Sequence, residues 1–213
     1  MVQERRSREQ RKAEIEDSLI LAARHCVYSE GPDVSVHDIA REAGVAVGTI
    51  YNHYESKGDL FAATGVRSFG EFNVWIEPVV SKIADPALRL ATFGRFMIRM
   101  PDSHVEHAHV LWHTQRFVWG PKYRPSEEGE LERDIKAGIA TGRFDATLIE
   151  AKMITILGAI LHFIGLRILD PKLPATKGDD VVEIAMTTLG VPSKEAHKLC
   201  HGRLPRRPKI ATD

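Results

Sequence analysis

A short stretch near the N-terminus places small, hydroxyl, amide and ring side chains on what would be one face of a helix. The outward positions are Val47, Gly48, Thr49, Tyr51, Asn52 and His53, and Lys57 lies just beyond them. Hydroxyl and amide groups can pair with base edges, and an ammonium group attracts phosphates. This set of side chains therefore suits a helix in the major groove of duplex DNA.

Two short helices joined by a tight turn would hold this face in place. Ser35 can cap the first helix, and its inward side chains would be Val36, Ile39, Ala40 and Ala43. Gly44 can adopt the left-handed conformation that redirects the chain, and Val45 can fill the turn. The second helix would turn Ile50 and Tyr54 inward. The pattern predicts a helix-turn-helix motif.

At these residues the chain resembles the TetR family of bacterial transcriptional regulators. The matching pattern comprises Ile39-Ala40, Gly44-Val45, Gly48-Thr49-Ile50-Tyr51, Tyr54, Ser56, Lys57 and Leu60-Phe61. Ala46 departs from the pattern, because the family usually places there a serine or threonine that caps the recognition helix. A missing cap costs on the order of 1 kcal/mol. The resemblance covers about the first third of the chain.

The resemblance also implies roles in DNA recognition for the aligned residues. Those that would set the fit to the groove are Val47, Gly48 and Thr49. Tyr51 and His53 look like phosphate-binding residues, and Lys57 would attract a phosphate together with the free N–H groups of its helix. Asn52 could pair with adenine, and His37 would reach a base or a phosphate. The alternatives are edge packing for Tyr51 and His53, and an idle exposed side chain for His37.

Length and charge indicate two units with local DNA affinity. The chain has 213 residues and 43% hydrophobic residues, enough for more than one small core. Because 29 basic residues balance 29 acidic ones, bulk charge does not favour nucleic-acid binding. The first twelve residues carry five basic and two acidic side chains, a net +3, and form either a phosphate-binding arm or a solvated end. The basic tail from residue 201 is expected to be disordered, or else to contact DNA or a partner.

The rest of the sequence indicates a cytoplasmic protein with no membrane span. Two cysteines, Cys26 and Cys200, imply no disulfide framework and fit a reducing compartment. The most apolar run, residues 153–166, has fourteen residues and is too short to cross a bilayer. No cofactor is indicated. Domains are expected at residues 1–56 for DNA binding and 57–200 for ligand binding and dimerisation, followed by the tail at 201–213.

No segment alternates polar and apolar residues with period two, so we expect an all-α fold. Besides the two short helices, the pattern predicts helices at about 10–29, 56–82, 86–100, 102–119, 126–141, 145–169 and 177–189. The helix at 56–82 would link the two domains. The helix at 145–169 carries a strip of mostly small residues, Ala151, Thr155, Gly158, His162 and Gly165. That strip can pack within the chain, whereas the resemblance implies a four-helix interface of a two-fold homodimer.

The second domain offers candidates for a small-molecule site, which the family resemblance implies. The ligand-binding candidates are Phe72, Trp75, Phe93, Phe96, Met97, Met100, His109, Trp112, His113, Arg116 and Phe163. Most of the apolar ones would be core in any helical domain. His109 and His113 are four residues apart, a spacing that zinc sites use. The histidines from His104 to His113 are therefore pocket walls, ordinary histidines or a metal-sensing cluster.

These features together favour a ligand-responsive DNA-binding transcriptional regulator. It would bind a double-stranded, pseudo-palindromic operator as a homodimer and be released by a small organic effector. The alternatives are a metal-sensing regulator that uses the cluster from His104 to His113, and a constitutive architectural DNA binder. An enzyme is disfavoured, because the sequence has no nucleophile elbow, phosphate loop, redox cysteine pair or complete metal motif.

Overall fold

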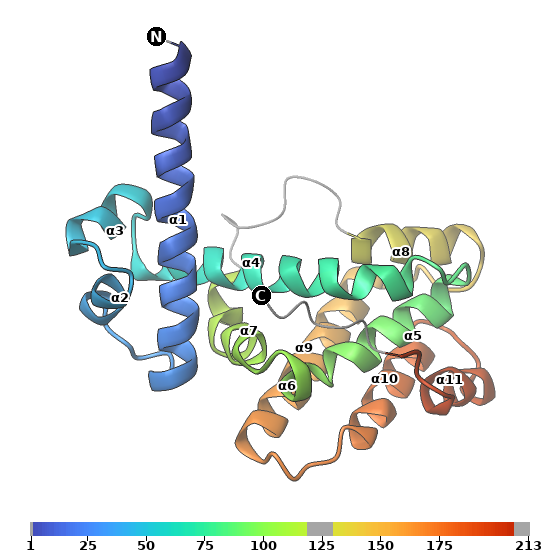
Figure 1. The fold of residues 1–213 in the computed structure, drawn as a ribbon. Coiled ribbons are helices and arrows are strands. Elements are labelled where there is room, and N and C mark those ends of the chain that lie inside the picture. The colour runs from blue at the N-terminus through green and yellow to red at the C-terminus, as the bar shows by residue number, and fades with distance from the viewer. Residues whose placement is uncertain (1, 119–129, 207–213) are drawn as a thin grey trace. The chain divides into compact units, whose positions relative to one another are not determined.

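The computed structural model describes residues 2–118 and 130–206, and in these ranges every regular element is a helix (Figure 1). The chain forms two compact units. Unit 1 comprises Met1–Gly70 and His109–Arg124, and unit 2 comprises Glu71–Ala108 and Pro125–Asp213. Two boundaries between the units fall inside helices, α4 (Lys57–Val80) and α7 (Val105–Val118). The all-α prediction is confirmed.

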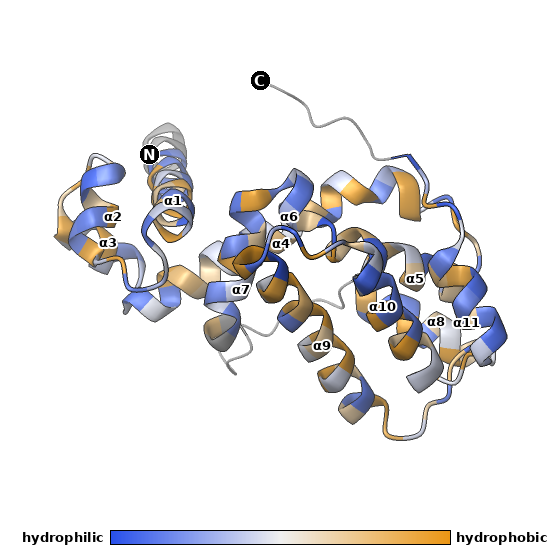
Figure 2. Cartoon of the chain, turned by 90° about the horizontal axis from the view of Figure 1, so that it is seen from below, coloured by the Kyte–Doolittle hydropathy of each residue, from blue (hydrophilic) through white to orange (hydrophobic). Residues whose placement is uncertain are grey.

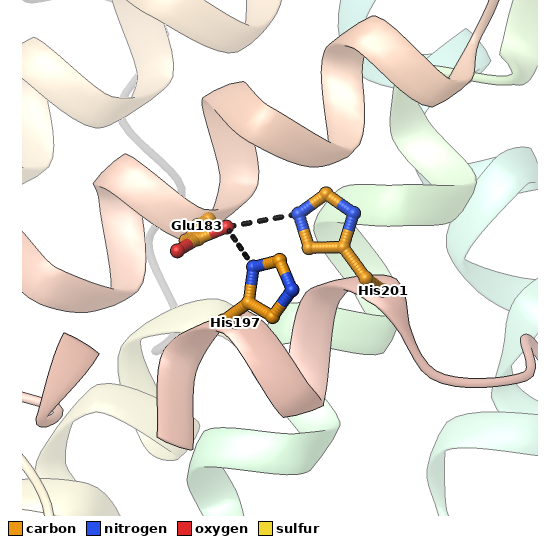
Figure 3. A group of neighbouring side chains, drawn as sticks. All are labelled: Glu183, His197 and His201. Carbon is orange, nitrogen blue, oxygen red and sulfur yellow. Dashed lines mark hydrogen bonds and ion pairs between the residues drawn. The ribbon is translucent and has the colours of Figure 1, made fainter. Parts of the chain in front are cut away.

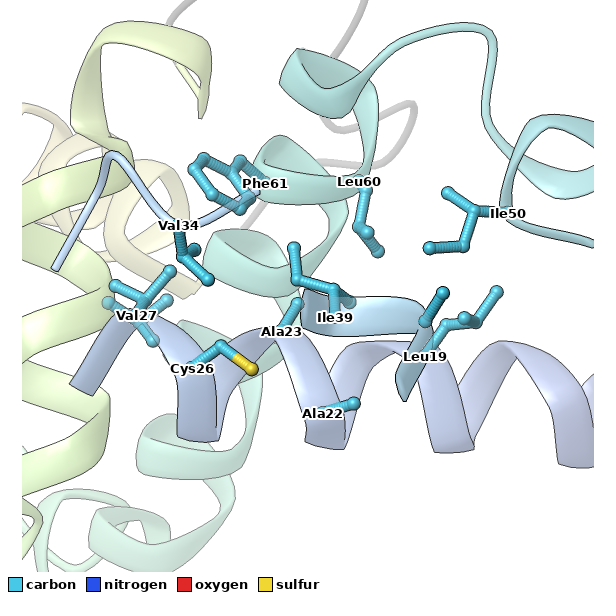
Figure 4. Packing of buried hydrophobic residues seen from close by; sticks show 12 residues of the cluster. Leu19, Ala22, Ala23, Cys26, Val27, Val34, Ile39, Ile50, Leu60 and Phe61 are labelled. Atoms are coloured by element: carbon cyan, nitrogen blue, oxygen red, sulfur yellow. The ribbon is translucent and has the colours of Figure 1, made fainter. Parts of the chain in front are cut away.

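Unit 1 is built on α1 (Val2–Glu30), which packs against α2 (Val36–Glu42) and is followed by α3 (Val47–His53). The first part of α4 and the end of α7 complete its core (Figure 4). The buried cluster consists of Leu19, Ala22, Ala23, Cys26, Val27, Val34, Ile39, Ala40, Ile50, Leu60, Phe61 and Val110. Helix α1 begins earlier than the sequence predicted. The side chains of residues 1–8, which make up most of the expected N-terminal phosphate-binding arm, lie outside the described part of the chain.

Unit 2 is organised around α5 (Pro86–Met97), which contacts four other helices of the unit. These are α8 (Glu130–Ala140), α9 (Ile149–Leu169), α10 (Thr176–Thr188) and α11 (Ser193–His201). Gly94 permits the close approach of α10, because a Cβ at Gly94 would lie 3.3 Å from both methyl groups of Val182. The side chains of α5 are buried around most of its circumference, which makes it the central helix of the unit.

The helix boundaries between residues 97 and 105 differ from the prediction, and the difference has a local cause. Asp85 caps α5 as expected, accepting from the Ala87 N–H at 3.2 Å, but the helix ends at Met97. Pro101 has no N–H to continue the helix and instead lies in the first turn of α6 (Met100–Ser103). Helix α7 therefore starts separately at Val105. Helix α11 was not predicted at all, since its sequence is mostly polar and no side chain caps it.

A layer of buried charge joins α5 to α10. Asp179 accepts hydrogen bonds from Arg95 Nε at 3.0 Å and from both terminal nitrogens of Arg99 at 2.7 Å. The Asp179 side chain is 5% exposed. Arg95 also donates to the carbonyl oxygens of Leu199 and Gly202, at 3.4 and 2.9 Å, at the C-terminal end of α11. These bonds fix the positions of three helices of unit 2 relative to one another.

Helix α9 is 21 residues long and predominantly apolar. By length and composition alone it could cross a membrane, whereas the apolar run predicted from the sequence was too short. A core helix of a soluble protein passes the same test. Arg167 on α9 is buried and donates to the Ile98 carbonyl at 2.9 Å and to the Asp102 carboxylate at 2.7 Å. These polar contacts tie α9 to the helices of unit 2.

Candidate DNA-binding face and effector-binding residues

The turn between α2 and α3 has the geometry that the sequence predicted. Ser35 caps α2, its hydroxyl accepting from the Asp38 N–H at 3.1 Å, and Asp38 returns the bond to the Ser35 N–H, a capping box. The Ser35 hydroxyl also holds the pKa of Asp38 below its usual value. Gly44 has φ +67, which only glycine adopts without strain. Ala46 occupies the N-cap of α3 without a side-chain hydrogen bond, as its residue type requires.

Burial orients α3 so that its polar face is turned outward. Ile50 is fully buried in the core of unit 1, and Tyr54 packs against the same core. On the opposite side Tyr51 is 54% exposed, and Gly48 and Asn52 are also exposed. Two other groove-facing candidates, Val47 and Thr49, are half-buried. His37, at the start of α2, is exposed. The helix therefore presents Tyr51 and Asn52 to solvent, two of the side chains that the sequence assigned to DNA.

Two of the phosphate-binding candidates have protein partners. His53 is 9% exposed in its side chain, and its Nδ1 lies 3.2 Å from the Glu16 carboxylate on α1. Lys57 donates to the Pro32 carbonyl at 3.1 Å, and its ammonium lies 4.9 Å from the centre of the Phe61 ring. An ammonium has three donors, so this bond leaves Lys57 able to donate to a phosphate as well. The role of Glu16 could not be read from the sequence, because it lies 37 residues from His53.

Within unit 2, five rings gather near the end of α4. Trp75 lies 4.4 Å from His104 and 6.0 Å from Phe96, measured between ring centroids. Phe72 contacts Trp75, Phe93 and His104 with centroid separations of 5.6 to 6.1 Å. Among the described residues, the buried indole Nε1 of Trp75 has no hydrogen-bond partner. The candidates Met97, Met100 and Phe163 are also buried in this unit. We call Phe72, Trp75, Phe93, Phe96 and His104 the ring cluster.

The remaining ligand-binding candidates belong to unit 1. His109 packs edge-on against Tyr28 with ring centroids 5.0 Å apart, and His113 lies 6.0 Å from His109. Burial lowers the pKa of both imidazoles, which favours their neutral forms. Trp112 is half-buried, and the Arg116 side chain lies outside the described residues.

The histidines considered for metal sensing are divided between the two units. His104 joins the ring cluster, and His107 contacts Glu71 at 3.0 Å, both in unit 2. His109 and His113 belong to unit 1. In the described part of the chain, the side chains that converge as potential metal ligands are instead Glu183, His197 and His201. The spacing of His197 and His201 is visible in the sequence, but the contribution of α10 is not.

An apolar face on α9 and α10 is open to solvent in the single chain. Ile154 and Leu169 are each 75% exposed, and Ile184 on α10 is 66% exposed. Figure 2 shows apolar residues along much of α9. A Cβ at Gly158 would meet no atom within 4 Å, so the predicted small-residue strip is uncovered there, although Gly165 is buried. Exposed apolar faces of this kind mark interaction surfaces.

Similarity to solved structures extends over almost the whole chain. The structure of RolR in complex with resorcinol is 22% identical in sequence to this chain and superposes on it with a TM-score of 0.69. The match covers 92% of this chain and 98% of RolR. FadR from Bacillus subtilis with stearoyl-CoA shares 20% identity and a TM-score of 0.56, covering 80% and 97%. NalD, the secondary repressor of a multidrug efflux pump in Pseudomonas aeruginosa, shares 16% identity and a TM-score of 0.53, covering 84% and 96%. At these identities the likeness is one of fold.

Family profiles match both parts of the chain. The profile of bacterial regulatory proteins of the tetR family matches residues 19–64, and the tetracyclin repressor-like C-terminal domain matches residues 85–202. No curated protein sequence matches the chain. The second profile alone covers more than half of the chain, and the first coincides with the helix-turn-helix described above. The chain therefore belongs to the TetR family of bacterial regulatory proteins and is a ligand-responsive, DNA-binding transcriptional regulator.

Proposed function

We propose that this regulator acts in the cytoplasm as a homodimeric repressor, which binds a two-fold symmetric operator through its α3 helices and is released by a small organic effector. The observation that carries the proposal is the orientation of α3. Ile50 is buried in the core of unit 1, whereas Tyr51 is 54% exposed on the opposite side. A helix held in this way can enter a major groove, and a two-fold dimer would read two half-sites one helical turn apart.

We expect the outward residues to differ in role. Tyr51 and Lys57 would bind phosphates, because Tyr51 is exposed and the Lys57 ammonium keeps donors that its bond to Pro32 does not use. His53 would act by bracing α3 against α1, because its side chain is nearly buried beside Glu16. The residues that would read bases are Val47, Gly48, Thr49 and Asn52. His37 on α2 would add a further contact beside them. The exposed apolar face of α9 and α10 would form the dimer interface.

We expect Lys57→Ala and Tyr51→Phe to weaken binding to every duplex by similar factors. Lys57→Ala should also reduce the slope of log K against log salt by about 0.9, because it removes a cation, whereas Tyr51→Phe removes a neutral donor and should leave the slope unchanged. Thr49→Ala should instead change base preference, by about 1–3 kcal/mol at one position of the operator. Mobility shifts on duplexes selected from a random pool, repeated at several salt concentrations, measure both effects.

The control for these variants is Lys82→Ala, which removes an exposed ammonium just beyond α4. It should leave both affinity and salt slope unchanged. If Lys57→Ala and Tyr51→Phe also bind with wild-type affinity and slope, the assignment of α3 and the start of α4 to the DNA interface fails.

For the effector, the ring cluster favours a flat apolar molecule that carries an oxygen acceptor. An unsatisfied buried donor costs about 1–3 kcal/mol, so an acceptor for the Trp75 Nε1 would be strongly selected. Aromatic rings add edge-to-face contacts with the ring cluster. The RolR structure contains resorcinol, an aromatic diol, and the FadR structure contains a long acyl chain on coenzyme A. For this chain the ring cluster supports the aromatic class.

We expect phenols to bind unit 2 and to release operator DNA. Calorimetry with resorcinol and phenol should show binding that Trp75→Phe weakens about tenfold, because one hydrogen bond of about 1–1.5 kcal/mol is lost. The effector must bind the non-operator conformation better, so operator DNA should weaken effector binding by the same factor by which effector weakens operator binding. Benzene derivatives without oxygen that bind as tightly as phenol would contradict the role of Trp75.

A further inference from the structure

A cluster of potential metal ligands lies between α10 and α11 and shares no residue with the ring cluster. Two imidazoles on α11, His197 and His201, point to one carboxylate on α10, Glu183 (Figure 3). His197 Nδ1 lies 3.0 Å and His201 Nε2 lies 2.8 Å from the same Glu183 oxygen. Asp180, one turn earlier on α10, places a carboxylate oxygen 3.6 Å from His201 Nε2. Three potential ligands thus converge from two helices, with the Asp180 carboxylate beside them.

The two helices hold these ligands in a fixed arrangement. Helix α11 fully buries Ala196 and Cys200, the residues directly before the two histidines. Its C-terminal carbonyl groups accept hydrogen bonds from Arg95. Helix α10 buries Val182 and Met186 and is joined to α5 through Asp179. Ligands on rigid packed elements lose little conformational freedom when an ion binds, which favours binding.

The donor set and its exposure suit a borderline metal ion rather than magnesium or calcium. Neutral imidazole nitrogens with one or two carboxylate oxygens are ligands that zinc, nickel and cobalt prefer, and harder cations take oxygen alone. The side chains of Glu183 and His201 are 25% and 29% exposed, so an ion can enter and retain water as further ligands. The C-terminus of α11 also carries partial negative charge that favours a cation.

The distances need only a small adjustment to accept an ion. Bonds of about 2.0–2.1 Å from zinc to each ligand give separations of about 3.3 Å between ligand atoms in a tetrahedron. The three ligand atoms of Glu183, His197 and His201 lie within 4.8 Å of one another, and two of the separations are 2.8 and 3.0 Å. Small rotations of the exposed side chains, which move the ligand atoms by a few tenths of an ångström, would bring these separations to the tetrahedral value.

We propose that Glu183, His197 and His201, with the Asp180 carboxylate beside them, form a binding site for a divalent transition-metal ion of the zinc class. The ion links α10 to α11 across the turn at Gly190. Because Ile184 follows Glu183 directly on α10, the ion also fixes the helix that carries part of the exposed apolar face. The site is independent of the ring cluster and of the DNA-binding face.

The test uses the full chain after treatment with a chelator and removal of the chelate. Calorimetry with Zn²⁺, and visible absorbance with Co²⁺ as a reporter of tetrahedral ligation, should give one ion per chain. His201→Ala and Glu183→Gln should each weaken binding by more than about tenfold, since loss of a mere supporting group already costs about 10–100-fold. Zinc at about 100 times its Kd should reduce the unfolding equilibrium constant of the wild type about a hundredfold.

The matched control is His25→Ala, which removes a histidine of unit 1 whose Nε2 lies 4.0 Å from the Glu42 carboxylate. It should leave zinc affinity and stoichiometry unchanged. Thermal unfolding in chelator establishes that each variant is folded, and His197→Gln, which retains a hydrogen-bonding group, replaces any variant that is not. A wild type that binds no zinc at micromolar concentrations overturns the proposal. So does zinc binding that persists in both His201→Ala and Glu183→Gln.

Discussion

Replacing Asp179 by alanine is expected to lower the free energy of unfolding by about 3–5 kcal/mol, the usual cost of removing one partner of a buried ion pair. Asp179 is 5% exposed and is the shared acceptor for Arg95 and Arg99, whose side chains are 7% and 12% exposed. Without the carboxylate, two guanidinium groups would face each other with little access to water. Urea unfolding monitored by circular dichroism measures the change.

The control for this prediction is Asp180→Ala, at the next position of the same helix, measured in the presence of chelator. The Asp180 side chain is 55% exposed, and its contact with His201 is 3.6 Å long. An exposed ion pair contributes about 0–1 kcal/mol, so this variant should unfold close to the wild type. If Asp179→Ala were no less stable than Asp180→Ala, the buried charge layer would not hold α5 and α10 together.

The helix-turn-helix could be predicted from the sequence because its signals are local. A capping serine, a glycine that needs positive φ and a buried isoleucine occur within sixteen residues, and each is specific for one conformation. The structure confirms Ser35 as the cap, Gly44 at φ +67 and Ile50 as fully buried. The roles of the outward residues in DNA binding remain predictions.

Unit 2 was harder to predict because its determinants are far apart in the sequence. Arg95 and Asp179 are 84 residues apart, and no periodic pattern links them. Helix α11 has only nine residues, most of them polar, and its stability comes from packing of Ala196 and Cys200 against the unit. Local propensity is a weak guide to such short helices, since tertiary contacts stabilise them.

The histidines show the same limit at the level of sites. Proximity in the sequence grouped four of them between His104 and His113, but these belong to two different units. His197 and His201 share a helix face through their spacing alone, and the carboxylate that faces them comes from α10, at Glu183. Sequence spacing identifies ligands on one helix, whereas convergence of helices decides whether they form a site.

Charging the exposed apolar face of α9 and α10 is expected to separate the dimer and, with it, to abolish tight operator binding. Ile154 and Ile184 are 75% and 66% exposed in the single chain. A symmetric interface contains each of these residues once from each protomer. A double Ile154→Asp and Ile184→Asp variant would therefore place four unpaired carboxylates in an apolar contact. Burying unpaired charge costs far more than a dimer interface can compensate.

Light scattering should then give the mass of one chain, 23.8 kDa, for the double variant and twice that mass for the wild type. Operator affinity should fall by about 10²-fold or more, because two linked half-site contacts become independent ones. The matched control is Val74→Asp, which charges an apolar side chain that is 76% exposed on α4. It should remain dimeric and bind the operator. A wild type that is monomeric at micromolar concentration, or a double variant that remains dimeric, would show that this face is not the dimer interface.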